Sequence, residues 1–261
     1  MIVGAAICPC SPLLVRELTG QTEVLPELRT ACAAAVARVI AAGPDVIVVT
    51  GPGPRTDGWP ASARLNVAAY GPGTALPGNT ALPGNTALPG NRAPAGMAPP
   101  GLPLALGVGA RLLDEAGYAG PRELHGVAAL APAADCLRLG ARLAASAPRV
   151  ALLAMGDGSA RRSVSAPGYL DERAGPFDAA VERAVRDGDL EALAALDPGL
   201  ADELLATGRP AWQVLAGALG PDGAAAALRP EILYADAPLG VGYLVAAFTL
   251  VPAPSGPAAG R

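Results

Sequence analysis

The sequence contains very little histidine and no lysine. Its 261 residues include a single histidine, and all 19 basic side chains are arginine. A metal centre built from two or three histidines is therefore impossible within one chain. The net charge is −4, and no segment gathers enough arginine to form the basic patch that is typical of nucleic-acid-binding proteins. We expect no nucleic-acid partner.

Long apolar runs are also missing. A membrane-spanning helix needs roughly 20 consecutive apolar residues, whereas the longest candidate, residues 241–251, has the length of a strand. No basic stretch precedes the apolar segment at the N-terminus, so a secretory signal is not expected. The four cysteines are interpreted as reduced thiols, since a chain of this length needs no disulfide framework. Together these features predict a cytoplasmic protein without a membrane partner.

Apolar runs that alternate with helical patterns dominate what is present. Strands are predicted at 2–8, 45–50, 123–130 and 149–155, and a hairpin at 231–235 and 239–251. Helices are predicted at 23–42, 104–116 and 133–147, followed by four short helices between 177 and 219. A strand, a helix and a second strand joined by short connections form a parallel pair. The pattern predicts a three-layer α/β domain whose mostly parallel or mixed central sheet is flanked by helices.

One segment interrupts this pattern. The sequence Thr-Ala-Leu-Pro-Gly-Asn occurs in three tandem copies at 74–91. Proline and glycine in every copy disfavour a β-helix, so we predict a low-complexity repeat loop at 72–100. Residues 1–252 then form a single domain, and 253–261 form a disordered tail.

Candidate functional residues follow the predicted strands. In open α/β sheets, ligands bind beyond the carboxyl ends of the strands. Cys10 follows the first strand, and Asp157 follows the strand at 149–155. We predict that both line one pocket, which Tyr243 also reaches if the last strand is antiparallel to the others. Further residues expected to line this cleft are Ser11, Ser159, Arg161 and Gln213.

Each candidate has an alternative interpretation. Asp157 could act as an acid, a base or a ligand, or could simply close the turn between two glycines. Cys10 could be a reactive thiolate or an inert, packed side chain. His125, the only histidine, could be a base or a structural residue. Arg161 could bind an anion or be solvated.

Several segments also carry a family resemblance. They are the opening segment at 2–15, the middle blocks at 155–160, 166–171 and 176–178, and the last blocks at 208–217 and 237–243. Together they resemble an actinobacterial branch of the class III (LigB-type) extradiol ring-cleavage dioxygenase superfamily, which includes the Memo proteins. The resemblance implies a LigB-like fold with a cleft. It also implies Fe(II) held by two histidines and one glutamate, with a further histidine as acid or base.

The sequence departs from the family pattern at the iron ligands. Cys10 stands where the first ligand histidine is expected, and the Gly-Pro-Gly-Pro segment at 51–54 stands where the second is expected. No glutamate matches near 207–209, and the acid/base position falls near 157–159. Only His125-Gly126 matches a family His-Gly pair.

We therefore expect a LigB-like homologue with a degenerate iron site, without a bound cofactor, that does not cleave aromatic rings. Two alternatives stay open. One is an enzyme of altered chemistry, with Cys10 as nucleophile or soft ligand, His125 as base, and Asp157 beside them. The other is a module that reuses the cleft to bind a small aromatic molecule, another small molecule or a partner protein. The resemblance further implies that the chain can form a homo-oligomer.

Overall fold

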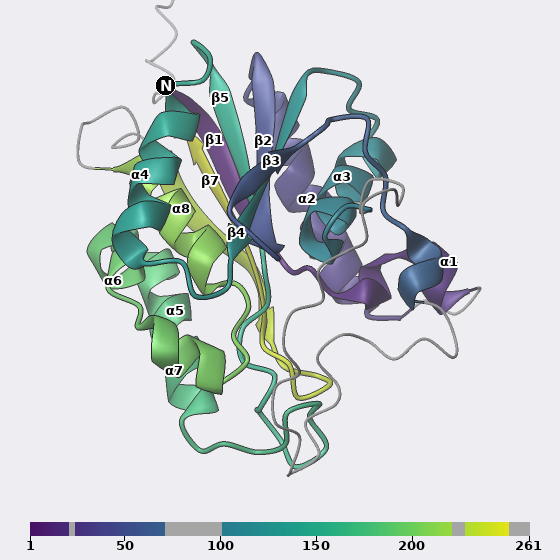
Figure 1. Ribbon diagram of the computed structural model, residues 1–261, viewed down its shortest axis with the longest axis vertical. Coiled ribbons are helices and arrows are strands. Elements are labelled where there is room, and N and C mark those ends of the chain that lie inside the picture. Colours follow the sequence, from purple (N-terminus) through teal and green to yellow (C-terminus); the bar gives the residue numbers. More distant parts are fainter. Residues whose placement is uncertain (21–23, 71–100, 221–227, 251–261) are drawn as a thin grey trace, which may run out of the picture.

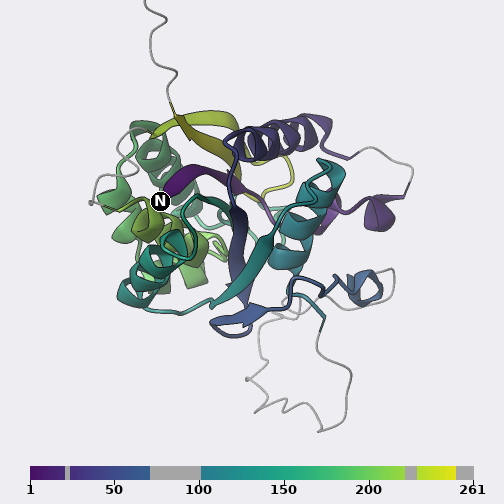
Figure 2. The same ribbon diagram turned by 90° about the horizontal axis from the view of Figure 1, so that it is seen from above.

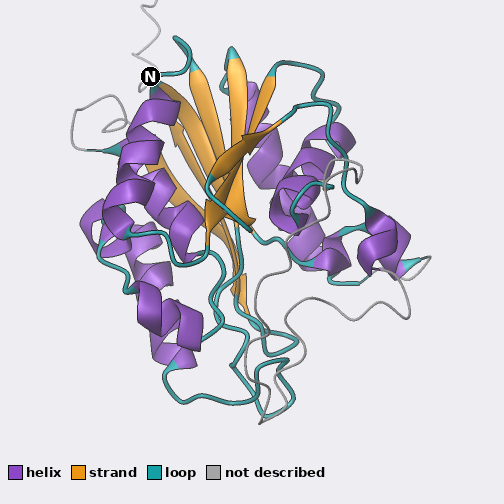
Figure 3. Cartoon of the chain, viewed as in Figure 1, coloured by secondary structure: helices purple, strands orange, loops and turns teal. Residues whose placement is uncertain are grey.

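The computed structural model describes residues 1–20, 24–70, 101–220 and 228–250 (Figure 1). The predicted repeat loop at 72–100 and the predicted tail at 253–261 lie outside the described residues. The described residues contain one seven-stranded sheet with the strand order β3-β4-β2-β5-β1-β7-β6. Figure 3 shows this sheet between two groups of helices.

The central part of the sheet is parallel. It consists of β4 (Arg122–Ala128), β2 (Val46–Gly53), β5 (Val150–Met155) and β1 (Ile2–Cys8). The strands at the edges are antiparallel to their neighbours: β3 (Asp57–Trp59) on one side, and β7 (Tyr243–Leu250) and β6 (Leu228–Asp236) on the other. The predicted α/β architecture with a mixed central sheet is confirmed.

Helices cover both faces of the sheet (Figures 1 and 2). One face carries α1 (Arg16–Thr19), α2 (Pro26–Ala41) and α3 (Leu104–Glu115). The other carries α4 (Ala133–Ala144), α5 (Ala174–Asp187), α6 (Leu190–Ala194), α7 (Pro198–Glu203) and α8 (Arg209–Leu219). Two separate apolar clusters, one on each side of the sheet, make up the core. Within the described ranges, every helix is too short or too polar to cross a bilayer.

Local sequence explains most of these elements. Strands β1 and β5 are buried along their whole length, which explains their continuous apolar composition. Helix α2 starts with Pro26, whose fixed φ suits the first helical position. Its buried residues Leu28, Cys32, Val36 and Val39 recur at intervals of three or four, so they form one apolar stripe.

Two features differ from the predictions. Strand β2 continues through Gly51-Pro52-Gly53, beyond the predicted end of this strand at residue 50. The ladder between β2 and β5 ends at Thr50, and beyond it Pro52 pairs with β4 alone. A strand that has a neighbour on one side only can accommodate the missing N–H of proline. Strand β3 was not predicted, because three residues are too few to show a strand pattern.

The topology brings three chain segments to one edge of the sheet. β1 and β5 are adjacent and parallel, with Cys8 opposite Met155, so both strands end at the same level. β7 runs antiparallel to β1, so it begins at this edge with Tyr243. The last strand is therefore antiparallel to its neighbour β1, which is the condition that we set for Tyr243 to reach this edge.

Candidate functional site

Cys10 and Asp157 are in direct contact beyond the ends of β1 and β5. The backbone N–H of Cys10 donates to Asp157 Oδ1 at 2.9 Å, and Cys10 Sγ lies 3.5 Å from Asp157 Oδ2. Each residue follows its strand by two positions, so the register that pairs Cys8 with Met155 also brings this pair together. The carboxylate therefore connects two neighbouring strand ends and does not close its own glycine turn.

Thr207 completes this cluster from a distant part of the chain. Its Oγ1 accepts a hydrogen bond from the Asp157 backbone N–H at 3.3 Å and lies 3.9 Å from Cys10 Sγ. Cys10 is buried and Asp157 is half-buried, whereas Thr207 is exposed. We call Cys10, Asp157 and Thr207 the edge cluster. Its polar groups therefore range from an exposed residue at the protein surface to a buried thiol.

Close backbone packing fixes the loop that carries Asp157. The N–H of Gly208 donates to the Asp157 carbonyl at 2.8 Å, which joins the end of β5 to the start of α8. A Cβ added at Gly156 would lie 2.3 Å from the Gly208 Cα, and one added at Gly208 would lie 2.2 Å from Trp212 Cζ2. Both positions therefore require glycine, and Asp157 and Thr207 flank this contact.

A second hydrogen-bonded pair lies beside the edge cluster. The Tyr243 hydroxyl donates to Ser11 Oγ at 3.3 Å, and both side chains are buried. Ser11 Oγ also accepts from the Leu13 backbone N–H at 3.3 Å, at the start of a 3₁₀ turn, Pro12–Leu14. Burial, with smaller contributions from the nearby charges of Asp157 and Cys10, raises the pKa of Tyr243 to about 12. Tyr243 is therefore a neutral hydrogen-bond donor at physiological pH.

Burial controls the electrostatics of the edge cluster. It raises the pKa of Asp157 to about 6, although hydrogen bonds from Cys10 oppose this shift. Burial, and then repulsion from the Asp157 charge, raise the pKa of the Cys10 thiol well above its ordinary value. At neutral pH the thiol is protonated and points toward a carboxylate. These values indicate a thiol with low nucleophilicity and a carboxyl group that titrates near pH 6.

His125 does not join the edge cluster. It lies within β4, opposite Thr50 of β2, and its Nε2 is 3.2 Å from Glu123 Oε2. It lines a separate pocket of about 320 Å³ together with Asp57 and Arg142. The other residues that line this pocket include Leu139 and Leu143 of α4, which places it on the face of the sheet opposite to the apolar cluster that contains Cys10. The structure therefore does not bring Cys10, Asp157 and His125 together.

Gln213 also lies away from the edge cluster. It is fully buried in α8, where its Nε2 donates to the carbonyls of Ala194 and Leu196 at 2.9 Å, and its Oε1 accepts from Arg209. Its role in the structure is to hold α6 and the residues after it against α8. The expectation that it lines the cleft is wrong, because a buried position on α8 faces the apolar cluster on this side of the sheet.

Ser159 and Arg161 stabilise the loop that follows Asp157. Ser159 Oγ donates to the Leu204 carbonyl at 2.8 Å and accepts from the Arg161 N–H at 3.1 Å. Arg161 Nη1 donates to the Gly168 carbonyl at 2.6 Å. Ser159 therefore ties the loop to the end of α7, and Arg161 bonds within the loop through Nη1, whereas its Nε is buried without a hydrogen-bond partner among the described residues.

The edge cluster does not fit the iron site that the family resemblance implies. A two-histidine, one-carboxylate site needs two imidazoles, whereas the chain has one histidine, and that histidine lies in β4. The edge cluster offers one thiol, one carboxylate and one hydroxyl, and the first two are bonded to each other. The described residues contain no group of three or more His, Cys, Asp or Glu side chains placed to hold a metal ion.

Sequence reasoning missed Thr207. It lies about 50 residues from Asp157, and the only local signal was its place just before the Gly-Arg-Pro segment that starts α8. The contact follows from the packing of two glycines, which a sequence pattern does not reveal.

Comparison with known proteins shows the fold alone. No family model matches the chain, and no curated protein matches it. Among solved structures, the uncharacterized protein JW3007 from Escherichia coli K12 is similar, with a TM-score of 0.53 and 16% sequence identity. The similarity covers 94% of this chain and 99% of that protein. The chain therefore has the same overall α/β architecture as that bacterial protein.

Proposed function

We propose that this chain is a LigB-like homologue that does not cleave aromatic rings and instead binds a small molecule at the carboxyl edge of its sheet. The observation that carries the proposal is the edge cluster. Cys10 stands where the family resemblance expects the first iron ligand, and its thiol is hydrogen-bonded to Asp157. A site in which these groups bond to each other is a polar binding surface, not a facial triad of ligands.

The chemistry of the edge cluster favours an uncharged ligand that bears a hydroxyl group. The Asp157 carboxylate can accept a hydrogen bond from such a group, and the exposed hydroxyl of Thr207 can donate or accept one. Tyr70 lies near enough to Cys10 for the thiolate charge to contribute to its raised pKa, which is due mainly to burial. Aromatic and hydroxyl groups at one edge support a small phenolic molecule as the ligand. A cytoplasmic location goes with this proposal, because all four cysteines are free thiols.

The catalytic part of the proposal is tested by anaerobic reconstitution with Fe(II), followed by addition of catechol and oxygen. We expect no ring-opened yellow product above the rate of Fe(II) in buffer. Turnover that depends on the protein and disappears with a chelator would overturn this part of the proposal.

The binding part is tested by saturation-transfer NMR with phenol and catechol in the absence of iron. We expect saturable binding that weakens about tenfold in Asp157→Ala, because one good hydrogen bond to a charged group is lost. Asp135→Ala, at an exposed position of α4, is the matched control and should bind as the wild type does. Equal binding by the two variants would exclude the edge cluster as the site.

An enzyme of altered chemistry is the second candidate. A carboxyl group with a strongly raised pKa beside a thiol is a pattern found at catalytic sites. This candidate would rely on Asp157, not His125, to take the proton from Cys10, since the histidine lies elsewhere. Its weakness is the raised pKa of the thiol, which keeps Cys10 protonated at neutral pH.

A further inference from the structure

A groove lies among α4, α6 and α8, in the helical layer that covers one face of the sheet (Figure 1). α4 packs backbone against backbone on α8, since a Cβ added at Gly140 would lie 2.0 Å from the Val214 carbonyl oxygen. α6 is held on α8 by the hydrogen bond from Gln213 to the Ala194 carbonyl. The groove that these three helices line has a volume of about 650 Å³, within the range of roughly 300–1,000 Å³ that is typical of small-molecule sites. We call this space the helix groove.

The wall of the helix groove is mostly apolar. It is lined by Leu137 and Ala141 of α4, Leu190 and Ala194 of α6, and Ala216 of α8. Leu137, Leu190 and Ala194 are half-buried at the margin of the apolar cluster on this face of the sheet, so part of each side chain remains in contact with water. An apolar ligand in the groove would remove this surface from water, which is the main source of affinity at sites of this kind.

Two acidic side chains at the start of α6 give the helix groove a negative rim. Asp189 and Glu191 both line the groove and are exposed, and neither forms an ion pair with a residue that the structure describes. Asp189 Oδ1 caps α6 by accepting from the Ala192 N–H at 2.9 Å, a neutral group that leaves the carboxylate charge uncompensated. Arg138, the arginine that lines the groove, is already paired with Asp135 on its own helix. The rim therefore attracts a cation and repels an anion.

The end of α8 adds to this negative rim. Gly220, which follows the last residue of α8, also lines the helix groove. The carbonyl groups in the last turn of a helix carry partial negative charge, which favours a cation nearby. The last turn of α8 contains no basic side chain that would compensate this charge.

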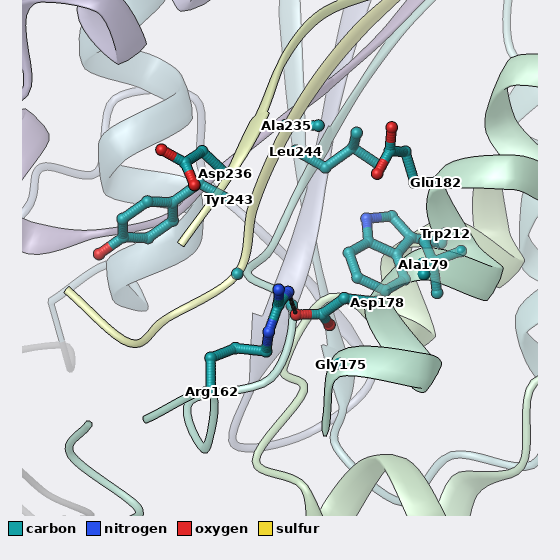
Figure 4. Close-up of a pocket in the computed structure, with 13 residues that line it drawn as sticks. Arg162, Gly175, Asp178, Ala179, Glu182, Trp212, Ala235, Asp236, Tyr243 and Leu244 are labelled. Carbon is teal, nitrogen blue, oxygen red and sulfur yellow. Dashed lines mark hydrogen bonds and ion pairs between the residues drawn. The ribbon is translucent and has the colours of Figure 1, made fainter. Parts of the chain in front are cut away.

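A smaller pocket between α5 and the connected ends of β6 and β7 provides a contrast (Figure 4). Its volume is about 140 Å³. Two of the three described carboxylates that line it are paired with arginine: Asp178 with Arg162 at 2.9 Å, and Glu182 with Arg186. The helix groove is larger, and neither of its carboxylates is paired, so it is the better site for a cationic ligand.

We propose that the helix groove binds an amphipathic organic cation, which consists of an ammonium group and an alkyl chain. The ammonium group lies beside Asp189 and Glu191, whose charges are unpaired, and the chain covers the half-buried Leu137 and Leu190. The apolar wall supplies most of the affinity, whereas the exposed carboxylates at the rim select the charge of the ligand. This site is separate from the edge cluster, because Cys10 belongs to the apolar cluster on the opposite face of the sheet. The proposal does not depend on the function proposed for the edge cluster.

Three probes that share a hexyl chain test this proposal by NMR titration of the full chain. Hexylammonium, hexan-1-ol and heptanoate carry a positive, a neutral and a negative head group. We expect saturable shifts in the ¹H–¹⁵N spectrum with hexylammonium and a dissociation constant on the order of 1 mM, reasonable for about seven non-hydrogen atoms. Hexan-1-ol should bind about threefold more weakly and heptanoate about tenfold more weakly, because the rim charges are exposed and each contributes little. High salt should reduce these differences, since it screens the rim charges.

Two variants of α4 locate the binding. Ala141 lines the helix groove, whereas Ala134 is exposed on the same helix outside it. Ala141→Met should narrow the groove and weaken hexylammonium binding about fivefold, because the probe loses contact with the apolar wall. Ala134→Met should leave binding unchanged, and the melting temperature of each variant shows whether it is folded. If Ala141→Met fails to fold, Leu190→Ala replaces it, since the loss of part of the wall should weaken hexylammonium and hexan-1-ol alike.

Removal of the rim charges separates charge from shape. The double variant Asp189→Asn with Glu191→Gln keeps an acceptor at the start of α6, because Asn also caps helices. It should weaken hexylammonium binding about fivefold and leave hexan-1-ol binding unchanged. Glu172→Gln, at an exposed position outside the groove, is the matched control and should bind all three probes as the wild type does.

Three results would overturn the proposal. Hexylammonium could fail to cause saturable shifts, which would mean that the helix groove does not bind such a cation. The three probes could bind equally, which would contradict selection by the rim charges. Binding could also persist unchanged in the groove-narrowing variant, which would place the ligand elsewhere on the chain.

Discussion

Two charged groups in this protein, the half-buried Asp157 and the buried Arg209, are accommodated in different ways. Asp157 at the sheet edge and Arg209 at the start of α8 each lack an ion-pair partner of opposite charge in the described part of the chain. Arg209 is 1% exposed, yet its guanidinium donates to the carbonyls of Ala129 and Ala131 and to Gln213 Oε1. Asp157 accepts one backbone N–H and one weak S–H donor.

The difference lies in how well backbone groups replace a counter-ion. Three good acceptors and a very high intrinsic pKa keep the arginine charged even though burial lowers its pKa. Asp157 has fewer and weaker donors, so burial prevails and its pKa rises to about 6. Arg209 is therefore a fixed structural charge, whereas Asp157 changes its charge within the physiological range. Of the two, only Asp157 has the property expected of a functional group.

The largest effect in this comparison is expected from Arg209→Met. The substitution removes the guanidinium donor from two buried acceptors, the Ala131 carbonyl and Gln213 Oε1, and from the partly buried Ala129 carbonyl, so we expect the free energy of unfolding to fall by about 3 kcal/mol. Urea unfolding at pH 7 measures this loss. Arg142→Met, at an exposed position of α4, is the control and should change stability by less than about 0.5 kcal/mol. Similar losses in both variants would show that the buried hydrogen bonds of Arg209 contribute no more than surface packing does.

The next effect concerns the pH dependence that Asp157 confers. Its pKa is near 6 in the folded protein and about 4 in the unfolded chain, so between these values the folded state binds more protons. The stabilisation from this proton is complete below pH 4 and is lost as the pH rises through 6. The full shift corresponds to about 3 kcal/mol, and partial solvent contact reduces our expectation to about 2 kcal/mol.

Unfolding of the wild type and of Asp157→Asn from pH 4 to pH 7 measures this dependence. The wild type should lose about 2 kcal/mol relative to the variant over this range. Asp171 offers a control of opposite sign, because its hydrogen bonds with Arg173 lower its pKa to about 2. The stabilisation that Asp171 contributes appears as the pH rises from 2 to 4 and is constant above pH 4. Asp171 should therefore leave the stability unchanged over the range in which Asp157 titrates. Parallel curves for the wild type and Asp157→Asn would contradict the raised pKa of Asp157.

A smaller effect is expected in the chemistry of Cys10. Its raised thiol pKa predicts modification by a thiol reagent at pH 7.5 at least tenfold slower than that of free cysteine. Asp157→Asn removes the carboxylate charge and should accelerate the reaction several-fold, because part of the shift is repulsion by that charge. Cys10→Ser identifies the signal among four buried thiols. Fast modification of Cys10 in the wild type would support the enzyme of altered chemistry.

The smallest effect is expected from deletion of residues 73–91. This segment lies outside the described residues, and the expectation rests on its sequence, which offers one leucine per six-residue repeat for burial. Loop-closure free energy changes by only about 0.6 kcal/mol for each doubling of loop length. The melting temperature should therefore change by less than about 5 °C, which calorimetry measures. A larger decrease would mean that the repeats pack against the core.

The sequence by itself determined most of the longer elements of this fold and one contact of the edge cluster. Continuous apolar runs identified β1 and β5 because both strands are buried on both faces. Cys10 and Asp157 could be placed together because the carboxyl ends of neighbouring parallel strands meet at one edge. Both inferences depend on short-range pattern and on general rules of chain topology.

Only the tertiary structure decided which side chains share a site. His125 lies within a strand of the parallel sheet and Cys10 follows another, yet the two residues contact opposite layers of the fold. Thr207 reaches Asp157 because two glycines, Gly156 and Gly208, let the start of α8 approach the end of β5. Such contacts depend on how closely two segments about 50 residues apart in the sequence fit together, and a shift of a few tenths of an ångström would change this fit. The periodicity of a sequence records which residues are buried, but not which distant segment covers them.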